Sequence, residues 1–228
     1  MKLLSTTVLT AGLVFLLGCG GQEISPKEVQ LNNDIDSVSY SLGVNIAKNI
    51  KSQGMDEINT GALTKAFNDV FEDQSLALDE STCNMIINTY FQNLQSSRAE
   101  DSKEAGIAFM EENKNKANIV TTESGLQYEI ITEGSGPIPK EDDNVTVHYH
   151  GTTIDGTVFD SSMERGEPVS FPVNGVILGW QEALKLMPTG SKWKIYVPSE
   201  LAYGERGAGR DIGPNETLIF EVELLNID

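Results

Sequence analysis

The spacing of apolar residues in this chain changes once, near Val120. Before that point apolar residues recur every three or four positions, as on one face of a helix, for example Leu63 and Phe67. After it they alternate with polar residues, as Val145 and Val147 do. The change predicts helices followed by an antiparallel sheet, which is an α+β fold class.

The helical part divides into three segments. The first spans about residues 36–54, the second follows Thr60 as a candidate N-cap, and the third begins near Asp79. A chain of 228 residues is long enough for one large or two small domains at about 150 residues each. An all-α domain over residues 34–94 is near the lower size limit for an independent core, so we expect it to dimerise with a second copy.

Residues 95–120 are mostly polar and predict a long connecting helix. Glycine inside a helix costs about 1 kcal/mol relative to alanine, so Gly106 marks a weak point where this rod is expected to flex. The remaining residues, 121–228, form the predicted sheet domain. One short helix interrupts its strands, is followed by Pro188 and Gly190, and must cover one face of the sheet. Its apolar residues are Trp180, Ala183, Leu184 and Met187.

The first residues predict export. Lys2 precedes an apolar run from Val8 to Leu17 that is too short to span a bilayer and is typical of a signal peptide. Gly18-Cys19 resembles the bacterial lipobox, which implies a signal peptide over residues 1–18, lipidation of Cys19 and a flexible tether over residues 19–33. The alternative is an ordinary secretory signal with a chance cysteine.

The chain is strongly acidic, with a formal net charge of −18. Such a surface repels phosphate backbones and anionic lipid headgroups, so nucleic acid is excluded as an expected partner and the membrane is expected to be reached through the lipid anchor only. With Cys19 lipidated, Cys83 is left without an intrachain partner. It is expected to be a small buried residue or a thiol that faces its copy in a dimer.

Several catalytic motifs are missing from the sequence. It has no phosphate-binding loop of the Walker type, no Gly-x-Ser-x-Gly elbow and no Cys-x-x-Cys pair. His148 and His150 share a strand face, but no third ligand is singled out, so a solvated face is favoured over a metal site. We expect no metal and no cofactor.

Aromatic residues at the ends of the predicted strands are either core or the walls of a pocket. Asp160 follows Phe159 in an otherwise apolar and hydroxyl context, where a lone acid needs a partner such as a tyrosine hydroxyl. Tyr149 and Tyr203 add polar tips to the apolar cluster, which favours a pocket. The full set is Tyr149, Phe159, Phe171, Trp180, Tyr203 and Phe220.

Five motifs in register resemble the FKBP family of peptidyl-prolyl cis-trans isomerases over about residues 121–228. They are VTVHYHG from Val145, VFDSS from Val158, VILGW from Val176, LAYG from Leu201 and NETLIFEVELL from Asn215. The stretch SYSLGVNIAKNIKSQGM from Ser39 is similar to the dimerisation domain of the long bacterial branch, which includes the macrophage infectivity potentiator and FkpA-like lipoproteins.

The resemblance implies that Trp180 lies under the proline ring of the substrate. It further implies that the Ile177 N–H and the Tyr203 hydroxyl bond substrate carbonyls, and that Asp160 orients Tyr149. The implied catalytic residues are Tyr149, Phe159, Asp160, Trp180, Tyr203 and Phe220, and the implied substrate-binding residues are Phe171, Val176, Ile177, Val169 and Ile212. The chain departs from compact members of the family at Val169, Leu201, Arg206, Arg210 and Asp211.

The function expected from this resemblance is isomerisation of X-Pro bonds in unfolded or extended polypeptides, assisting folding in the bacterial cell envelope. The alternative is a chaperone or adhesin that uses the same pocket and dimer cleft without catalysis. The expected location is lipid-anchored, at the outer membrane and facing the periplasm, with surface exposure as the alternative.

Overall fold

The computed structural model describes residues 30–228, and the predicted signal peptide, Cys19 and most of the predicted tether lie outside them. The described residues divide into two units, and the division falls between residues 49 and 50, inside the first helix. No helix of the described part is long and apolar enough to cross a membrane.

Helix α1 spans Asp34–Ser52 and is amphipathic but has no buried residue. The side chain of Asn33 accepts a hydrogen bond from the backbone N–H of Asp36 at 2.9 Å, which satisfies one of the free donors at the helix start. The apolar residues Val38, Leu42 and Ile46, which carry the predicted period, are 54%, 57% and 37% exposed. The apolar face of α1 is therefore uncovered within a single chain.

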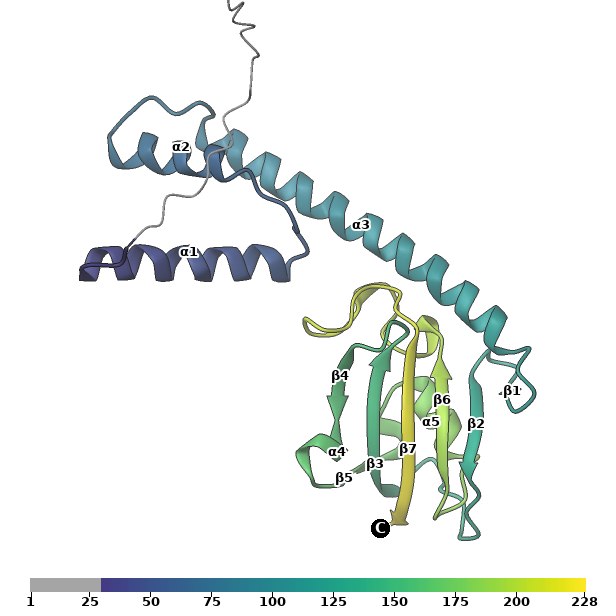
Figure 1. Cartoon of the computed structure of the whole chain (residues 1–228). Coiled ribbons are helices and arrows are strands. Elements are labelled where there is room, and N and C mark those ends of the chain that lie inside the picture. The colour runs from purple at the N-terminus through teal and green to yellow at the C-terminus, as the bar shows by residue number, and fades with distance from the viewer. Residues whose placement is uncertain (1–29) are drawn as a thin grey trace, which may run out of the picture. The chain divides into compact units, whose positions relative to one another are not determined.

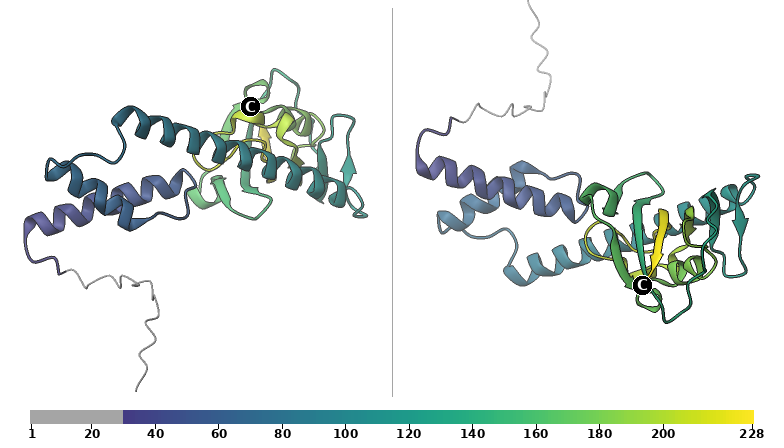
Figure 2. Two further views of the ribbon diagram at one scale, coloured as in Figure 1. Left: turned by 90° about the horizontal axis from the view of Figure 1, so that it is seen from above. Right: turned by 90° about the horizontal axis from the view of Figure 1, so that it is seen from below.

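Helices α2 and α3 follow as two capped segments. Helix α2 spans Thr60–Phe71, and its N-cap is Asn59 rather than the predicted Thr60, because the Asn59 side chain accepts from the Ala62 N–H at 3.0 Å. Helix α3 spans Glu80–Asn113 without interruption and is capped by Asp79, whose carboxylate accepts from the Thr82 N–H at 2.8 Å. Both views in Figure 2 show α3 as one long helix.

Most residues in the carboxyl-terminal half of α3 are exposed, but Gly106, where the sequence predicts a weak point, contacts the sheet domain. Gly106 is buried, and a Cβ at this position would lie 2.4 Å from the Thr217 hydroxyl oxygen. Close to the helix end, Asn113 Nδ2 donates to Gln127 Oε1 at 2.9 Å, and Asn113 is fully buried. Gly106 is therefore the residue that allows α3 to approach the sheet domain, because any side chain there would collide with Thr217.

The sheet domain contains seven antiparallel strands (Figure 1). The strands are β1 (Val120–Thr121), β2 (Gln127–Thr132), β3 (Asn144–Thr153), β4 (Val158–Ser161), β5 (Val169–Pro172), β6 (Lys192–Val197) and β7 (Leu218–Ile227). Their order is β1-β2-β6-β7-β3-β4, and β5 pairs with the first half of β3. Strand β3 therefore has β7 on one side and β5 followed by β4 on the other.

One face of the sheet and helix α5 (Leu178–Leu184) together form the core. Alternate residues of β3, β6 and β7 point into it, as the period of two predicts. Gly179 permits a close approach of α5 to β6, because a Cβ there would lie 2.5 Å from a methyl group of Val197. Among the fully buried core residues are Leu126, Val145, Val147, Val173, Leu184, Met187, Ile195, Val197, Leu218, Val222 and Leu224.

The predicted fold class is confirmed: helices precede an antiparallel sheet that packs against one short helix. A second, still shorter helix was not predicted. Helix α4 spans Ser162–Arg165, a single turn that begins at Ser161 and ends at Gly166 in the left-handed conformation. Three short 3₁₀ segments, η1 (Val173–Gly175), η2 (Ser199–Leu201) and η3 (Gly204–Arg206), connect the strands around the site described next.

Candidate active site

A cavity of about 630 Å³ is lined by residues of α5, of strands β3, β4, β5 and β7, and of the loop after η3. The structure brings all eleven sequence-predicted pocket residues to its lining. They are Tyr149, Phe159, Asp160, Val169, Phe171, Val176, Ile177, Trp180, Tyr203, Ile212 and Phe220. Gly175, Ala208, Gly209 and Asp211 also line the cavity and were not among the predicted pocket residues.

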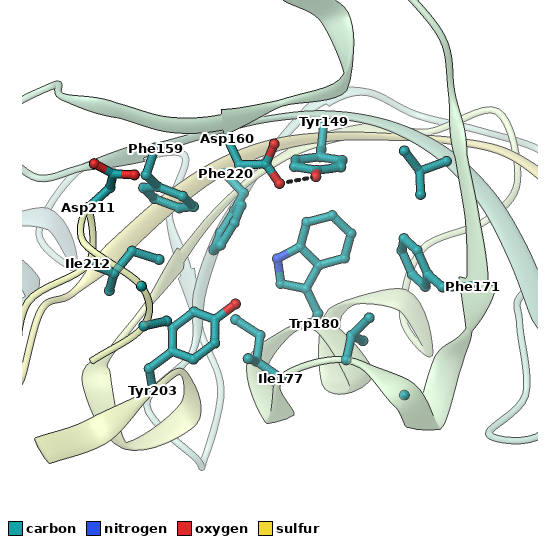
Figure 3. Close-up of a pocket in the computed structure, with 15 residues that line it drawn as sticks. Tyr149, Phe159, Asp160, Phe171, Ile177, Trp180, Tyr203, Asp211, Ile212 and Phe220 are labelled. Atoms are coloured by element: carbon teal, nitrogen blue, oxygen red, sulfur yellow. Dashed lines mark hydrogen bonds between the residues drawn. The ribbon is translucent and has the colours of Figure 1, made fainter. Parts of the chain in front are cut away.

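Trp180 forms the centre of the cavity lining (Figure 3). It lies on α5 and is only 5% exposed, so most of its ring is packed. Its ring makes edge-to-face contacts with Tyr149 at 5.4 Å, Phe220 at 5.2 Å and Phe171 at 5.7 Å between centroids. Edge-to-face contacts of this kind add about 0.5–1.5 kcal/mol each beyond area burial. Trp180 is thus at once a core residue and part of the pocket wall.

Asp160 and Tyr149 face each other from adjacent strands. The Tyr149 hydroxyl donates to Asp160 Oδ2, as the resemblance implies. Arg165, on α4, completes a group of three: its Nη1 donates to Asp160 Oδ1 and its Nη2 donates to the Tyr149 hydroxyl at 3.0 Å. The guanidinium also lies over the Tyr149 ring, 5.7 Å from its centroid. Asp160 therefore has two partners, the phenol of Tyr149 and the guanidinium of Arg165.

These contacts decide the charge of Asp160. Partial burial acts to raise the pKa of Asp160, but hydrogen bonds from Tyr149 and Arg165 outweigh it and hold the pKa below its usual value. The pKa of Tyr149 is raised, first by burial and then by the hydrogen bond to Asp160. At neutral pH the group therefore consists of a carboxylate, a protonated phenol and a guanidinium.

Arg165 was not identified from the sequence. It lies in a four-residue helix whose length gives no periodic signal, and it is exposed, as surface arginines usually are. The one available signal was that Asp160 needs a hydrogen-bonding partner, and the sequence analysis named only a tyrosine hydroxyl for this role.

Serine side chains at the end of β4 and the start of α4 bond to strand β3. Ser162 Oγ accepts from the Tyr149 backbone N–H at 2.8 Å and lies 3.1 Å from Nδ1 of His148. His150 Nδ1 lies 3.0 Å from Ser161 Oγ. Both imidazoles are thus bonded to serine hydroxyls, and within residues 30–228 no group of three or more metal-binding side chains is present.

Ile177 and Tyr203 line the wall of the cavity across from Tyr149 and Asp160 (Figure 3). Ile177 is the N-cap of α5, and its carbonyl accepts from the N–H groups of Trp180 and Gln181 at 3.0 and 3.1 Å. Tyr203 is 41% exposed, and Figure 3 shows its hydroxyl pointing into the cavity. Burial, and then the negative charge of Asp160, raise the pKa of Tyr203, so its hydroxyl stays protonated at neutral pH.

The loop after η3 forms the last wall and is closed by two backbone hydrogen bonds. The Ala208 N–H donates to the Ile212 carbonyl at 2.8 Å, and the Ile212 N–H donates to the Ala208 carbonyl at 3.2 Å. Gly207 has a φ of 62°, and a Cβ there would lie 2.3 Å from the Ile212 carbonyl oxygen, so this turn requires glycine. The closed loop places Ile212, which is 9% exposed, in the cavity lining.

Comparison with known proteins places this chain in one family. The family described as "FKBP-type peptidyl-prolyl cis-trans isomerase" matches residues 136–225, and the family described as "Domain amino terminal to FKBP-type peptidyl-prolyl isomerase" matches residues 35–130. The chain belongs to the FKBP-type peptidyl-prolyl cis-trans isomerases. Within them it has the architecture of the long branch, in which an amino-terminal domain precedes the isomerase domain.

Individual relatives agree with this assignment. The chain is 42% identical to "Outer membrane protein MIP" of Legionella longbeachae over 234 aligned positions, covering 100% of this chain and 98% of the relative. It is 45% identical to the "FKBP-type 22 kDa peptidyl-prolyl cis-trans isomerase" of Escherichia coli K12, covering 83% and 93%. The crystal structure of FkpA from Escherichia coli superposes with a TM-score of 0.68 at 34% identity, covering 86% of this chain and 98% of that one.

Proposed function

We propose that the cavity lined by Trp180, Ile177 and Tyr203 binds X-Pro segments and that its residues act as follows. The activity itself, peptidyl-prolyl cis-trans isomerisation of proline-containing polypeptides, is that of the family to which the chain belongs. The proposal concerns how these residues achieve it. The observation that carries it is the joint placement of all eleven predicted residues around one cavity.

The reaction requires rotation about an amide bond, not bond cleavage. Resonance makes the barrier about 18–20 kcal/mol, and X-Pro bonds isomerise unaided in tens to hundreds of seconds. The twisted amide loses charge separation at its carbonyl, so a site that excludes water disfavours the planar state more than the twisted one. The ring-lined cavity around Trp180 is such a site, which explains why no general base is needed.

In this proposal the proline ring lies on the face of Trp180, between Tyr149 and Phe171. The Ile177 N–H and the Tyr203 hydroxyl donate to substrate carbonyls on either side of the ring. Asp160 holds the Tyr149 hydroxyl and thereby fixes the position of the phenol ring beside the substrate. Phe159 and Phe220, whose centroids lie 5.4 Å apart, form the side wall.

The test is catalysis by the chain and two variants, Phe159→Ala and Asp160→Ala. We expect the wild type to accelerate isomerisation of an Ala-Pro tetrapeptide and both variants to be slower. A matched control is Asp142→Ala, an exposed acid outside the cavity. Suppression of client aggregation without any acceleration of isomerisation would instead support the non-catalytic peptide-binding alternative, which the membership of the isomerase family disfavours.

The isomerase functions in the cell envelope. We propose further that Cys19 is lipidated and anchors the chain to the outer membrane, facing the periplasm. The lipobox-like Gly18-Cys19 at the end of the apolar run supports this, as does the name of the Legionella longbeachae relative. Replacement Cys19→Ser should release the protein from the membrane fraction, and protease treatment of intact cells distinguishes a periplasmic from a surface-exposed chain.

We also propose a homodimer formed through the amino-terminal helices. Large apolar side chains of α1, α2 and the first half of α3 are uncovered in the single chain, with Ile35 73%, Val70 61% and Phe71 82% exposed. Monomeric soluble proteins rarely leave so many apolar side chains in water. Cys83, expected to be a small buried residue or a thiol that faces its copy in a dimer, is half-buried in one chain, and a second copy would cover this part of α3 further.

A further inference from the structure

The rim of the cavity carries two carboxylates that differ in their partners. Asp160 forms an ion pair with Arg165. Asp211, the other acid of the lining, has no ion pair or hydrogen bond to its carboxylate within residues 30–228. No lysine or arginine lines this cavity; Arg98 and Arg210 line a neighbouring cavity that Asp211 also borders, but neither forms an ion pair with it, so Asp211 gives the rim a carboxylate without a direct partner.

The closed loop holds Asp211 at the cavity. Asp211 precedes Ile212, whose N–H and carbonyl both bond to Ala208. Figure 3 shows the Asp211 side chain beside Phe159, at the edge of the ring-lined cavity. Ile212 is buried whereas Asp211 is exposed. Ile212 is therefore placed to contact an apolar group of the substrate, and Asp211 is placed to face the parts of the polypeptide that extend out of the cavity.

The residues on either side of the bound proline extend past the rim of the cavity, where Asp211 lies. The proline ring occupies only part of a 630 Å³ cavity, and the polypeptide continues on both sides of it. A side chain next to proline that passes Asp211 meets a carboxylate next to apolar rings, where attraction is less weakened than in open water. A cationic side chain gains from this contact, and an acidic one is repelled.

We propose that Asp211 makes this isomerase prefer X-Pro segments with lysine or arginine immediately before proline over segments with glutamate or aspartate at that position. The inference rests on the proposed function and assigns a substrate class to the same site. An exposed charge pair of this kind changes kcat/KM by about two- to five-fold, and salt screens it.

The whole chain complicates a simple comparison of peptides. Its formal net charge of −18 attracts every cationic peptide, irrespective of Asp211. The experiment therefore needs a variant that removes the same charge elsewhere. Asp142→Asn serves this purpose, because Asp142 is exposed and lies outside the cavity.

The test measures kcat/KM of the full chain for three tetrapeptides that differ only in the residue before proline: lysine, alanine or glutamate. A protease-free assay follows the return to equilibrium after a solvent jump that enriches the cis isomer. We expect the lysine-to-glutamate ratio of the wild type to exceed that of Asp211→Asn by about two- to five-fold, and the difference to shrink at 0.5 M salt. Asp142→Asn should retain the wild-type ratio.

Each result has a defined meaning. Equal ratios in wild type, Asp211→Asn and Asp142→Asn would overturn the role of Asp211 and leave the proposed function intact. The same fall in both variants would also overturn it, because the preference would then come from the overall charge. Failure of the wild type to accelerate even the alanine peptide would overturn the proposed function together with this inference.

Discussion

Arg165 donates from Nη2 to the Tyr149 hydroxyl at 3.0 Å, and the same guanidinium pairs with Asp160. One arginine therefore contacts both members of the phenol–carboxylate pair at the cavity wall. We classify it as a positioning residue, because it is absent from the cavity lining and acts through Tyr149 and Asp160.

Replacing Arg165 with methionine should lower kcat/KM by about two- to five-fold. The reduction is modest because the side chains of Arg165 and Asp160 are 49% and 43% exposed, and exposed pairs contribute little. The loss should appear in kcat more than in KM, since Arg165 does not touch the substrate. Glu164→Gln, a neighbouring exposed change, is the control. Full activity of Arg165→Met beside a slow Asp160→Ala would show that Tyr149 and Asp160 do not need the arginine.

The lowered pKa of Asp160 predicts a pH dependence. A carboxyl whose pKa is lower in the folded state contributes stability above its unfolded pKa of about 3.9, and this contribution is lost as the pH falls through the folded value. Because Asp160 keeps its negative charge down to about pH 4, the ratio of wild-type to Asp160→Asn activity should be constant from pH 8 to pH 5 and fall only below about pH 4. A decline of this ratio centred near pH 6 would mean that Asp160 is not held in its charged form.

Trp180→Ala should both unfold more easily and lose activity, because this ring belongs to the core and to the cavity wall. Loss of a large buried aromatic costs about 3–5 kcal/mol, which urea denaturation would detect as a lower midpoint. Phe159→Ala is the comparison, since Phe159 is only half-buried and should lose activity at a smaller cost in stability. Equal destabilisation by the two changes would contradict the double role of Trp180.

The sequence predicted the inward face of the sheet because alternation is a local signal. Val145 and Val147 are both fully buried, as their spacing requires. Spacing alone could not separate core from pocket at Trp180, since both roles put the ring on the same side of α5. The resemblance to a family, not the period, gave the eleven cavity residues.

The contacts that the sequence missed follow no repeating pattern. Arg165 reaches Asp160 from a single helical turn, and Gly106 meets Thr217 from another part of the chain. In the sequence, a glycine in a polar helix looks the same whether the helix flexes there or packs closely against another segment. Only the packing of α3 against the sheet domain distinguishes the two.

Gly106→Ala therefore provides a test with a defined sign. In an isolated helix the change would stabilise by up to about 1 kcal/mol. Here the new methyl group would lie 2.4 Å from the Thr217 hydroxyl oxygen, and overpacking of this kind costs about 1–3 kcal/mol, so we expect net destabilisation in urea. The double change Gly106→Ala with Thr217→Ala should recover part of the loss relative to the sum of the single changes. A more stable Gly106→Ala would show that α3 does not dock at this point.

Val70→Lys should dissociate the proposed homodimer without unfolding the single chain. Val70 is 61% exposed on α2, so a lysine there costs the monomer little, whereas inside an apolar interface it would bury an unpaired charge. Ile107→Lys is the matched control, because Ile107 is 58% exposed on α3 but lies outside the predicted dimerisation segment, residues 34–94. Sedimentation velocity of the full chain at tens of micromolar should give a dimer for the wild type and for Ile107→Lys and a monomer for Val70→Lys. A monomeric wild type would refute the dimer, and a dimeric Val70→Lys would place the interface elsewhere.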